Sequence, residues 1–182
     1  MQSINKQESV RVVVMGVTGC GKSTCAIAIA NAIKGRFCDG DSLHSPDCVE
    51  KMRRGIPLND NDRWPWFSRI ATFLNADSSS AVVACSALKK TYRDFLRREV
   101  PNVRFVFLDA SCKTVAARVS QRQGHYMPAS LVDSQFAALE PPLNEPRVTI
   151  VSADAPVAEI VSSFLVSIGA NTGEDENGTS NT

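Results

Sequence analysis

The sequence lacks three features that would point to a particular partner: a charge excess, a long apolar run and an apolar segment in its first nine residues. Its 20 Lys and Arg balance 19 Asp and Glu, which leaves a formal net charge of +1. Nucleic-acid binders use a strongly basic surface to displace counterions, so we expect no nucleic-acid partner. No apolar run is long enough to cross a bilayer, and residues 1–9 lack the apolar core of a signal peptide. We therefore expect no membrane partner.

The cysteines also lack a pattern of their own. None of the six belongs to a C-x-x-C pair, and four lie in apolar runs where a small hydrophobic residue would serve. This usage is typical of a reducing compartment, and the final Ser180-Asn181-Thr182 is not a peroxisomal address. We therefore expect a cytoplasmic protein. At 182 residues, the core needs neither disulfides nor a structural metal.

Short apolar runs alternate with helical stretches along most of the chain. The runs, each short enough for a buried strand, cover residues 10–15, 36–38, 81–85, 103–108 and 148–151. The helical stretches between and after them cover residues 25–33, 89–98, 113–122 and 156–166. Such alternation predicts an α/β fold of three layers, in which helices cover both faces of a parallel sheet.

Two polar stretches interrupt this alternation and predict insertions over an active site. Residues 39–66 contain a helix of their own, because Ser45-Pro46 supplies a cap and a first-turn proline and Gly55 supplies a stop. Residues 123–143 form the second insertion, a lid. Its helix is expected to restart at the capping-box pattern Ser130-Leu131-Val132-Asp133.

The domain organisation that follows is simple. One domain is expected over residues 10–170, preceded by a flexible N-terminus at residues 1–9, and no internal repeat is evident. Residues 171–182 are Asn, Thr, Gly, Glu, Asp and Ser only, a composition that cannot bury enough apolar surface to become ordered. We therefore expect a disordered tail.

A glycine-rich segment between a predicted strand and a predicted helix carries the first chemical signal. Gly16-Val17-Thr18-Gly19-Cys20-Gly21-Lys22-Ser23 matches the pattern G-x-x-x-x-G-K-[ST] of a phosphate-binding loop (P-loop). Its glycines let backbone N–H groups face a phosphate chain, Lys22 adds a point charge, and Ser23 offers a hydroxyl to Mg²⁺. ATP and Mg²⁺ are therefore the expected ligands. The predicted nucleotide contacts are Gly16, Thr18, Gly19, Cys20, Gly21, Lys22, Ser23 and Thr24.

Two carboxylates follow the second predicted strand. Asp39 and Asp41 flank Gly40 at the carboxyl end of that strand, where open α/β sheets place their ligands. One carboxylate can hold Mg²⁺ through water while the other orients and deprotonates a hydroxyl. The alternative is an Asp-Gly-Asp turn with no chemical role.

A series of further motifs carries a family resemblance. They are Asp39-Gly40-Asp41-Ser42-Leu43-His44, Glu50-Lys51-Met52, Gly55-Ile56-Pro57-Leu58-Asn59-Asp60-Asn61-Asp62-Arg63, Pro65-Trp66, Cys85-Ser86-Ala87-Leu88-Lys89-Lys90-Thr91-Tyr92-Arg93-Asp94, Gly124-His125-Tyr126-Met127, residues 131–136 and Leu139-Glu140. Together they closely resemble the gluconokinase family, over about residues 10–165. The resemblance implies the fold of shikimate and nucleoside-monophosphate kinases, a homodimer, and transfer of phosphate from ATP to the C6 hydroxyl of D-gluconate. Pro141-Pro142 departs from the family, which commonly has a second acidic residue before a single proline. The resemblance therefore does not predict the hinge of the lid, although it still predicts the chemistry.

The same resemblance implies roles for individual residues. Asp41 would face the terminal hydroxyl of the sugar acid, and Asp39 would help to hold Mg²⁺. The substrate's carboxylate needs a fixed cation, and Arg63 is the first candidate because its planar fork matches a carboxylate. Lys89 and Arg93 are further candidates, with a charged helix surface as the alternative.

Three more side chains complete the predicted site. His44 is a candidate partner of the polyol hydroxyls, with a structural hydrogen bond as the alternative. Arg118 and Arg122 lie one helical turn apart, a spacing at which arginines of related kinases stack on adenine and contact phosphate. We therefore expect Arg118 on the adenine side and Arg122 at the transferring phosphate; the alternative is two solvated arginines. Lys22, Asp41 and Arg122 are thus the predicted catalytic residues.

Rival functions remain at this point. One is a kinase of the same group that acts on shikimate or a nucleoside monophosphate; the other is a nucleotide-binding regulator without turnover. A pure regulator needs no acceptor base, so the Asp39 and Asp41 pair argues against it. Cys20 adds a question of reactivity, because a helix N-terminus and a lysine favour its thiolate. A buried, inert thiol is the alternative.

Overall fold

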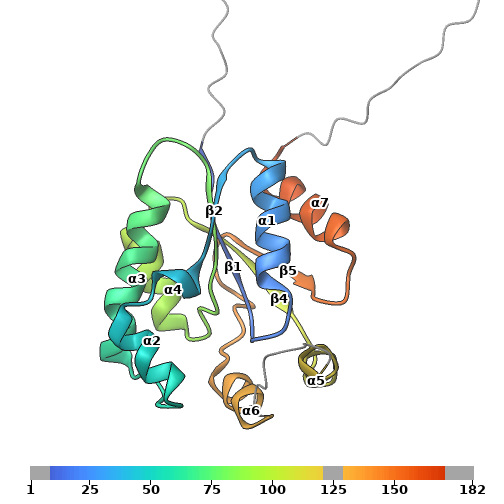
Figure 1. Ribbon diagram of the computed structural model, residues 1–182. Coiled ribbons are helices and arrows are strands. Elements are labelled where there is room, and N and C mark those ends of the chain that lie inside the picture. The colour runs from blue at the N-terminus through green and yellow to red at the C-terminus, as the bar shows by residue number, and fades with distance from the viewer. Residues whose placement is uncertain (1–8, 121–128, 171–182) are drawn as a thin grey trace, which may run out of the picture.

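The computed structural model describes residues 9–120 and 129–170 (Figure 1). The expected flexible N-terminus, apart from its last residue, and the expected disordered tail fall outside these residues. Among the described helices, none has both the length and the apolar character needed to span a membrane.

A five-stranded parallel sheet forms the centre of the molecule. Its strands are β1 (Arg11–Met15), β2 (Arg36–Asp39), β3 (Ala81–Ala84), β4 (Arg104–Asp109) and β5 (Val148–Ser152). They lie in the order β2-β3-β1-β4-β5, and every neighbouring pair is parallel. The apolar runs in β1, β3 and β4 are buried, as expected for strands covered on both faces. The predicted parallel sheet is confirmed.

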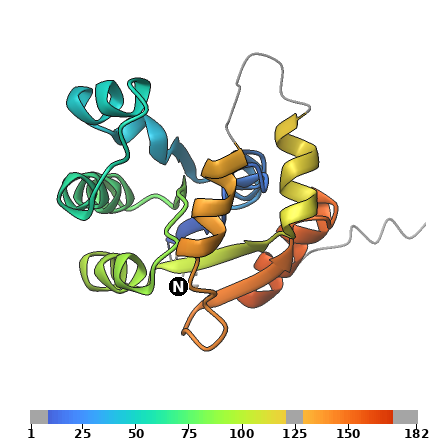
Figure 2. The same ribbon diagram turned by 90° about the horizontal axis from the view of Figure 1, so that it is seen from below.

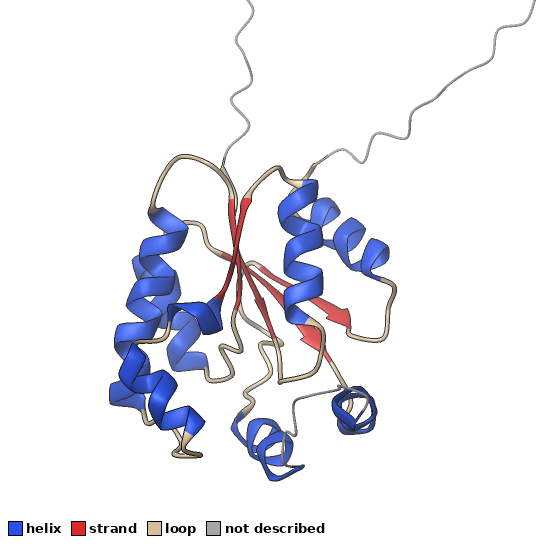
Figure 3. Ribbon diagram, viewed as in Figure 1, coloured by secondary structure: helices blue, strands red, loops and turns tan. Residues whose placement is uncertain are grey.

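Helices cover both faces of this sheet (Figure 3). They are α1 (Lys22–Ala32), α2 (Pro46–Arg53), α3 (Asp60–Asn75), α4 (Lys90–Glu99), α5 (Cys112–Ser120), α6 (Ala129–Ala138) and α7 (Val157–Ser167), with a short 3-10 helix at Gly40–Leu43. One core cluster joins α1 and α7 to the sheet, and a second joins α3 and α4 to the opposite face. The predicted three-layer α/β fold is therefore confirmed.

The carboxyl ends of the strands point toward the side where α5 and α6 lie (Figures 1 and 2). The loop from β1 to α1 opens at this edge, and so does the 3-10 helix that follows β2. The edge is where an open α/β sheet collects ligand-binding groups.

The two expected insertions differ in detail from the sequence pattern. The expected end of the first one, residue 66, lies inside the helix α3, which the sequence does not predict and which packs Phe67 and Ile70 into the core. The helix was missed because its first turn is polar and Pro65 interrupts the apolar pattern. In the second insertion a helix does restart, but it begins at Ala129, so Ser130 lies inside it and not at its N-cap.

Candidate active site

The phosphate-binding loop owes its shape to its glycines. Gly16 has φ +144, and a Cβ there would lie 2.9 Å from the Leu108 carbonyl oxygen and from the Cys20 sulfur. Gly21 has φ +104 and is the N-cap of α1, so the first helical amides face the loop. Lys22 donates from Nζ to the Val17 carbonyl oxygen at 3.0 Å, which places its ammonium over the loop.

Ser23 and Asp39 meet at the start of α1. Ser23 Oγ donates to Asp39 Oδ2 at 2.8 Å, although the two residues are 16 positions apart in the sequence. The other oxygen, Asp39 Oδ1, accepts from the backbone N–H of Asp41 at 3.1 Å and so caps the 3-10 helix. The structure therefore brings the two predicted metal-binding residues side by side. Thr24, the next loop residue, is exposed on α1.

Gly40 fixes the direction of the two acidic residues. A Cβ at Gly40 would lie 2.5 Å from the Ala84 carbonyl oxygen at the end of β3, so only glycine fits there. Trp66 Nε1 donates to the Gly40 carbonyl oxygen at 2.6 Å and holds the turn from the other side. With the turn fixed in this way, the exposed Asp41 carboxylate has no hydrogen-bond partner among the described residues.

His44 lies against the same tryptophan. Its ring stacks on Trp66 at a centroid distance of 4.3 Å and an interplanar angle of 15°. Burial lowers the pKa of His44, and the nearby Asp41 carboxylate partly opposes this. Nδ1 of His44 is buried without a partner in the described part of the chain. A neutral imidazole that has one unpaired nitrogen beside Asp41 is suited to hydrogen-bond a hydroxyl-rich ligand.

A cluster of charges lies where α3 and α4 begin. Arg63 donates from Nη1 to Asp60 Oδ1 at 3.1 Å and to the Tyr92 hydroxyl at 3.2 Å. Lys89 Nζ lies 3.5 Å from the same carboxylate. The positive charge of Arg63 also contributes to the lowered pKa of His44, after burial and the charge of Arg69. Two of the three predicted carboxylate-binding cations, Arg63 and Lys89, are thus brought together on the Asp60 carboxylate.

Arg93 does not belong to this cluster. Its side chain is fully buried and pairs with Glu145, and its Nη1 donates to the carbonyl oxygens of Ala87 and Leu88 at 2.9 and 2.8 Å. Nη2 donates to the Glu140 carbonyl oxygen at 2.8 Å. These contacts and the bonds from Nε to Glu145 occupy the whole guanidinium, so no donor is left for a substrate. The expectation of a substrate contact at Arg93 is therefore corrected: its guanidinium holds the loop after β3 in place.

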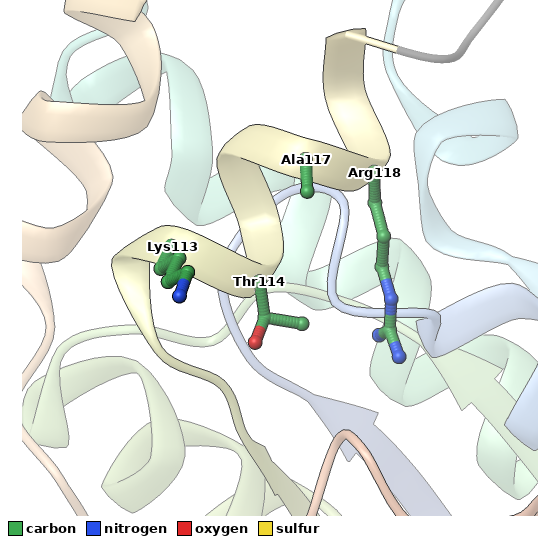
Figure 4. Close-up of a pocket in the computed structure, with 4 residues that line it drawn as sticks. All are labelled: Lys113, Thr114, Ala117 and Arg118. Atoms are coloured by element: carbon green, nitrogen blue, oxygen red, sulfur yellow. The ribbon is translucent and has the colours of Figure 1, made fainter.

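Arg118 lies between the phosphate loop and the end of β5. It donates to the carbonyl oxygens of Cys20 at 3.0 Å and Ala153 at 2.8 Å. A pocket of about 490 Å³ is lined by Lys113, Thr114, Ala117 and Arg118, and Figure 4 shows Arg118 extending from α5 on the same side as Thr114. The position suits the predicted adenine side of the site. Arg122 and His125 lie outside the described residues.

The cysteines all have free thiols, and Cys20, Cys25, Cys48 and Cys85 are buried. Burial raises the pKa of Cys20, and the opposing effects of Lys22 and Arg118 are smaller. The expectation that the loop favours a Cys20 thiolate is therefore wrong, and the buried, inert thiol is the alternative that fits.

Several residues of the candidate site are not predicted from the sequence. Gln135 in α6 accepts from the Thr18 backbone N–H at 2.7 Å and so ties this helix to the phosphate loop. Asp60 and Tyr92 hold the cations described above, and Glu145 pairs with Arg93. Asp60 could have been found because it precedes Arg63 by three residues, the spacing of an ion pair on a helix. Nothing in the local sequence connects Gln135 or Glu145 to partners so distant along the chain.

Comparison with known proteins agrees with this geometry. A family model described as shikimate kinase matches residues 18–167. The thermosensitive gluconokinase of Escherichia coli (strain K12) is 44% identical over 133 residues, which cover 71% of this chain and 71% of that protein. The gluconokinase of Gluconobacter oxydans (strain 621H) is 44% identical over 146 residues, which cover 79% of this chain and 82% of that protein.

A solved structure extends the agreement to three dimensions. The gluconokinase from Sinorhizobium meliloti 1021 has a TM-score of 0.81 and 45% identity, and the match covers 89% of this chain and 93% of that one. Sequence identity at this level, over most of both chains and in the same fold, establishes the family and bears out the resemblance drawn from the motifs. The chain belongs to the gluconokinases, within the shikimate kinase family of P-loop proteins.

Proposed function

We propose that the protein is an ATP-dependent kinase that transfers a phosphoryl group to the C6 hydroxyl of D-gluconate. The observation that carries this proposal is the position of Asp41, which stands free beside the phosphate loop while Asp39 is held by Ser23. Membership of the gluconokinases supports D-gluconate as the acceptor. Residues 10–170 would then act as one kinase domain.

The transfer itself needs little covalent chemistry from the protein. The C6 oxygen attacks the γ-phosphorus, the bond from that phosphorus to the β–γ bridging oxygen breaks, and ADP leaves. Asp41 orients the hydroxyl and accepts its proton, while Lys22 and Arg122 balance the charge that spreads over the transferred group. The backbone amides of the loop, from Gly16 to Thr24, hold the phosphates, and Arg118 lies at the adenine.

Mg²⁺ fits the residues at the start of α1. Ser23 and Asp39 offer a hydroxyl and a carboxylate, the hard oxygen ligands that Mg²⁺ takes together with water and substrate phosphates. When bound, Mg²⁺ would neutralise phosphate charge.

The sugar acid would lie between these groups and the cations of α3 and α4. Its terminal hydroxyl would face Asp41, its carboxylate would pair with Arg63 and Lys89, and His44 would bond a hydroxyl between them. Closure of the lid at residues 123–143 would exclude water, which otherwise competes for the phosphoryl group. Pro141-Pro142 lies at the end of this lid, where Glu140 is anchored by a bond from its N–H to the Leu88 carbonyl oxygen.

The test is a steady-state assay of ADP release with MgATP and a panel of acceptors. We expect turnover with D-gluconate and little with shikimate or AMP. Preference for shikimate or AMP would assign the protein to another kinase of the group, and nucleotide binding without any acceptor turnover would indicate a regulator.

We further propose that the protein acts in the cytoplasm as a homodimer. The six free thiols suit a reducing compartment, and the family resemblance supports a dimer. Light scattering on the purified protein measures the dimer directly, with twice the mass of 19.7 kDa as the expected result.

A further inference from the structure

Asp60 is an acidic residue that lies between the cations proposed to bind the carboxylate of the sugar acid. It is the first residue of α3, and its carboxylate contacts both cations proposed for the substrate's carboxylate. A carboxylate in that position competes with the ligand for the same cations, so its presence needs a physical reason.

The first part of that reason is the rigid support beneath Asp60. Tyr92 donates from its hydroxyl to Asp60 Oδ1 at 2.6 Å. The Tyr92 ring is buried and packs against Phe67 at 4.7 Å and edge-on against Trp64 at 5.4 Å. The hydroxyl is therefore fixed by aromatic packing, and it fixes the carboxylate in turn.

The second part is what Asp60 does to the two cations. Arg63 and Lys89 are long side chains, with 33% and 37% of their surface exposed, and without a partner both would sample many rotamers. Asp60 holds one nitrogen of the Arg63 fork, Nη1, and lies 3.5 Å from Lys89 Nζ. Nε and Nη2 of Arg63 have no partner within residues 9–120 and 129–170, so the free edge of the fork remains available to a second carboxylate.

The third part is the balance of charge. The hydrogen bond from Tyr92 lowers the pKa of Asp60, so the group is ionised at neutral pH. Two cations and one anion leave a single net positive charge, which matches one carboxylate. The side chains of Arg63 and Lys89 are thus ordered before the substrate binds, so binding loses little of their conformational entropy.

We propose that Asp60 is a positioning residue that, supported by Tyr92, orders Arg63 and Lys89 for the carboxylate of the sugar acid. This inference rests on the proposed function and names the part of the site that recognises the acid end of the substrate. Asp60 acts through the two cations and does not contact the reacting atoms.

The proposal predicts a specific kinetic pattern for Asp60→Ala. Removing Asp60 takes the ion pair from both cations and leaves Arg63 only its bond to the Tyr92 hydroxyl. Ordering the two side chains on binding then costs more than the attraction gained from one extra positive charge at an exposed, salt-screened site. We expect the KM for D-gluconate to rise about 3- to 10-fold, with kcat within about twofold of the wild-type value and the KM for MgATP unchanged. Tyr92→Phe keeps the ring and removes the hydroxyl, so it should raise the same KM by a smaller factor.

Epistasis separates positioning from a structural effect. In an Arg63→Ala background, the further change Asp60→Ala should alter the KM for D-gluconate by less than about twofold, because the main group it positions is gone. Asp62→Ala is the matched control. Asp62 lies in the same turn but bonds Lys51 and the Asn59 N–H, so its loss should lower the melting temperature and leave this KM unchanged.

Three results would overturn the proposal. The first is an unchanged KM for D-gluconate in both Asp60→Ala and Tyr92→Phe, and the second is an equal rise of this KM in Asp62→Ala. The third is that Asp60→Ala raises this KM as much in the Arg63→Ala background as in the wild type. If the wild-type enzyme turns over D-gluconate while any of these results is obtained, the proposed function stands and only the role of Asp60 fails. A wild-type enzyme that does not use D-gluconate would overturn both.

Discussion

Ser23 Oγ donates a hydrogen bond to Asp39 Oδ2 at 2.8 Å and so joins the first helix to the end of the second strand. The bond brings together a hydroxyl from the phosphate loop and a carboxylate from a separate segment. Asp39 also accepts from the N–H of Asp41, so a single carboxylate positions both the Ser23 hydroxyl proposed for Mg²⁺ and the proposed base.

The metal dependence of the enzyme should therefore depend on Asp39. We expect Asp39→Asn to raise the Mg²⁺ concentration needed for half-maximal activity by roughly 10-fold or more, because the charge next to Ser23 is lost. Activity measured against free Mg²⁺ at saturating nucleotide gives this value. Asp47→Asn, on the exposed first turn of α2, is the control and should behave like the wild type. An unaltered Mg²⁺ requirement in Asp39→Asn would remove that residue from the metal site.

Asp41 should matter for turnover and not for nucleotide binding. Asp41→Asn keeps the shape of the side chain but cannot accept the proton of the C6 hydroxyl. We expect kcat to fall roughly 10²- to 10⁴-fold, while calorimetry with a non-hydrolysable ATP analogue shows wild-type affinity. Near-normal turnover would show that another group accepts the proton.

Arg93 should affect stability more than substrate binding. Arg93→Met removes a buried guanidinium, leaves the Ala87 and Glu140 carbonyl oxygens without their side-chain donor, and takes the Arg93 partner from the Glu145 carboxylate. We expect a loss of about 3 kcal/mol in the free energy of unfolding, and a melting temperature lower by roughly 6–12 °C. Arg98→Met is the control, because Arg98 is exposed on the same helix and should change the melting temperature little.

One outcome would contradict a structural role of Arg93. A variant with the melting temperature of the wild type and a raised KM for D-gluconate would restore the substrate contact that the sequence alone predicts.

The thiol of Cys20 should be slow to react in the folded protein. Burial raises its pKa, so at pH 7–8 a smaller fraction is thiolate than at an ordinary cysteine, and that fraction grows only as the pH rises. With iodoacetamide at pH 8, mass spectrometry should find Cys112, which is exposed, alkylated well before Cys20. Rapid labelling of Cys20 that MgATP suppresses would contradict this and would support a reactive loop cysteine.

The fold could be predicted largely from local patterns. The apolar runs of β1, β3 and β4 are each buried on both faces, so their sequences carry the strand signal directly. The helix α3 was not predicted because its first turn consists of polar residues, among them Asp60 and Arg63, which bond each other. These polar residues interrupt the apolar periodicity by which a buried helix is identified in a sequence.

The site was predictable to the extent that its residues sit in motifs. Ser23 and Asp39 meet as expected because the loop and the strand end share one edge of the sheet. The Arg93 and Glu145 pair was not predictable, because 52 residues separate the partners and only the packed structure shows that Arg93 is fully buried. Cys20 was misjudged for the same reason, since burial outweighs the nearby positive charges.

The product of the reaction tests the central claim most directly. The protein would be incubated with MgATP and uniformly ¹³C-labelled D-gluconate, and the product examined by ¹³C and ³¹P NMR. Our account predicts one phosphorylated product, with coupling between phosphorus and C6, formed in step with ADP. A phosphate on another oxygen, or ADP formed only with free phosphate, would contradict it.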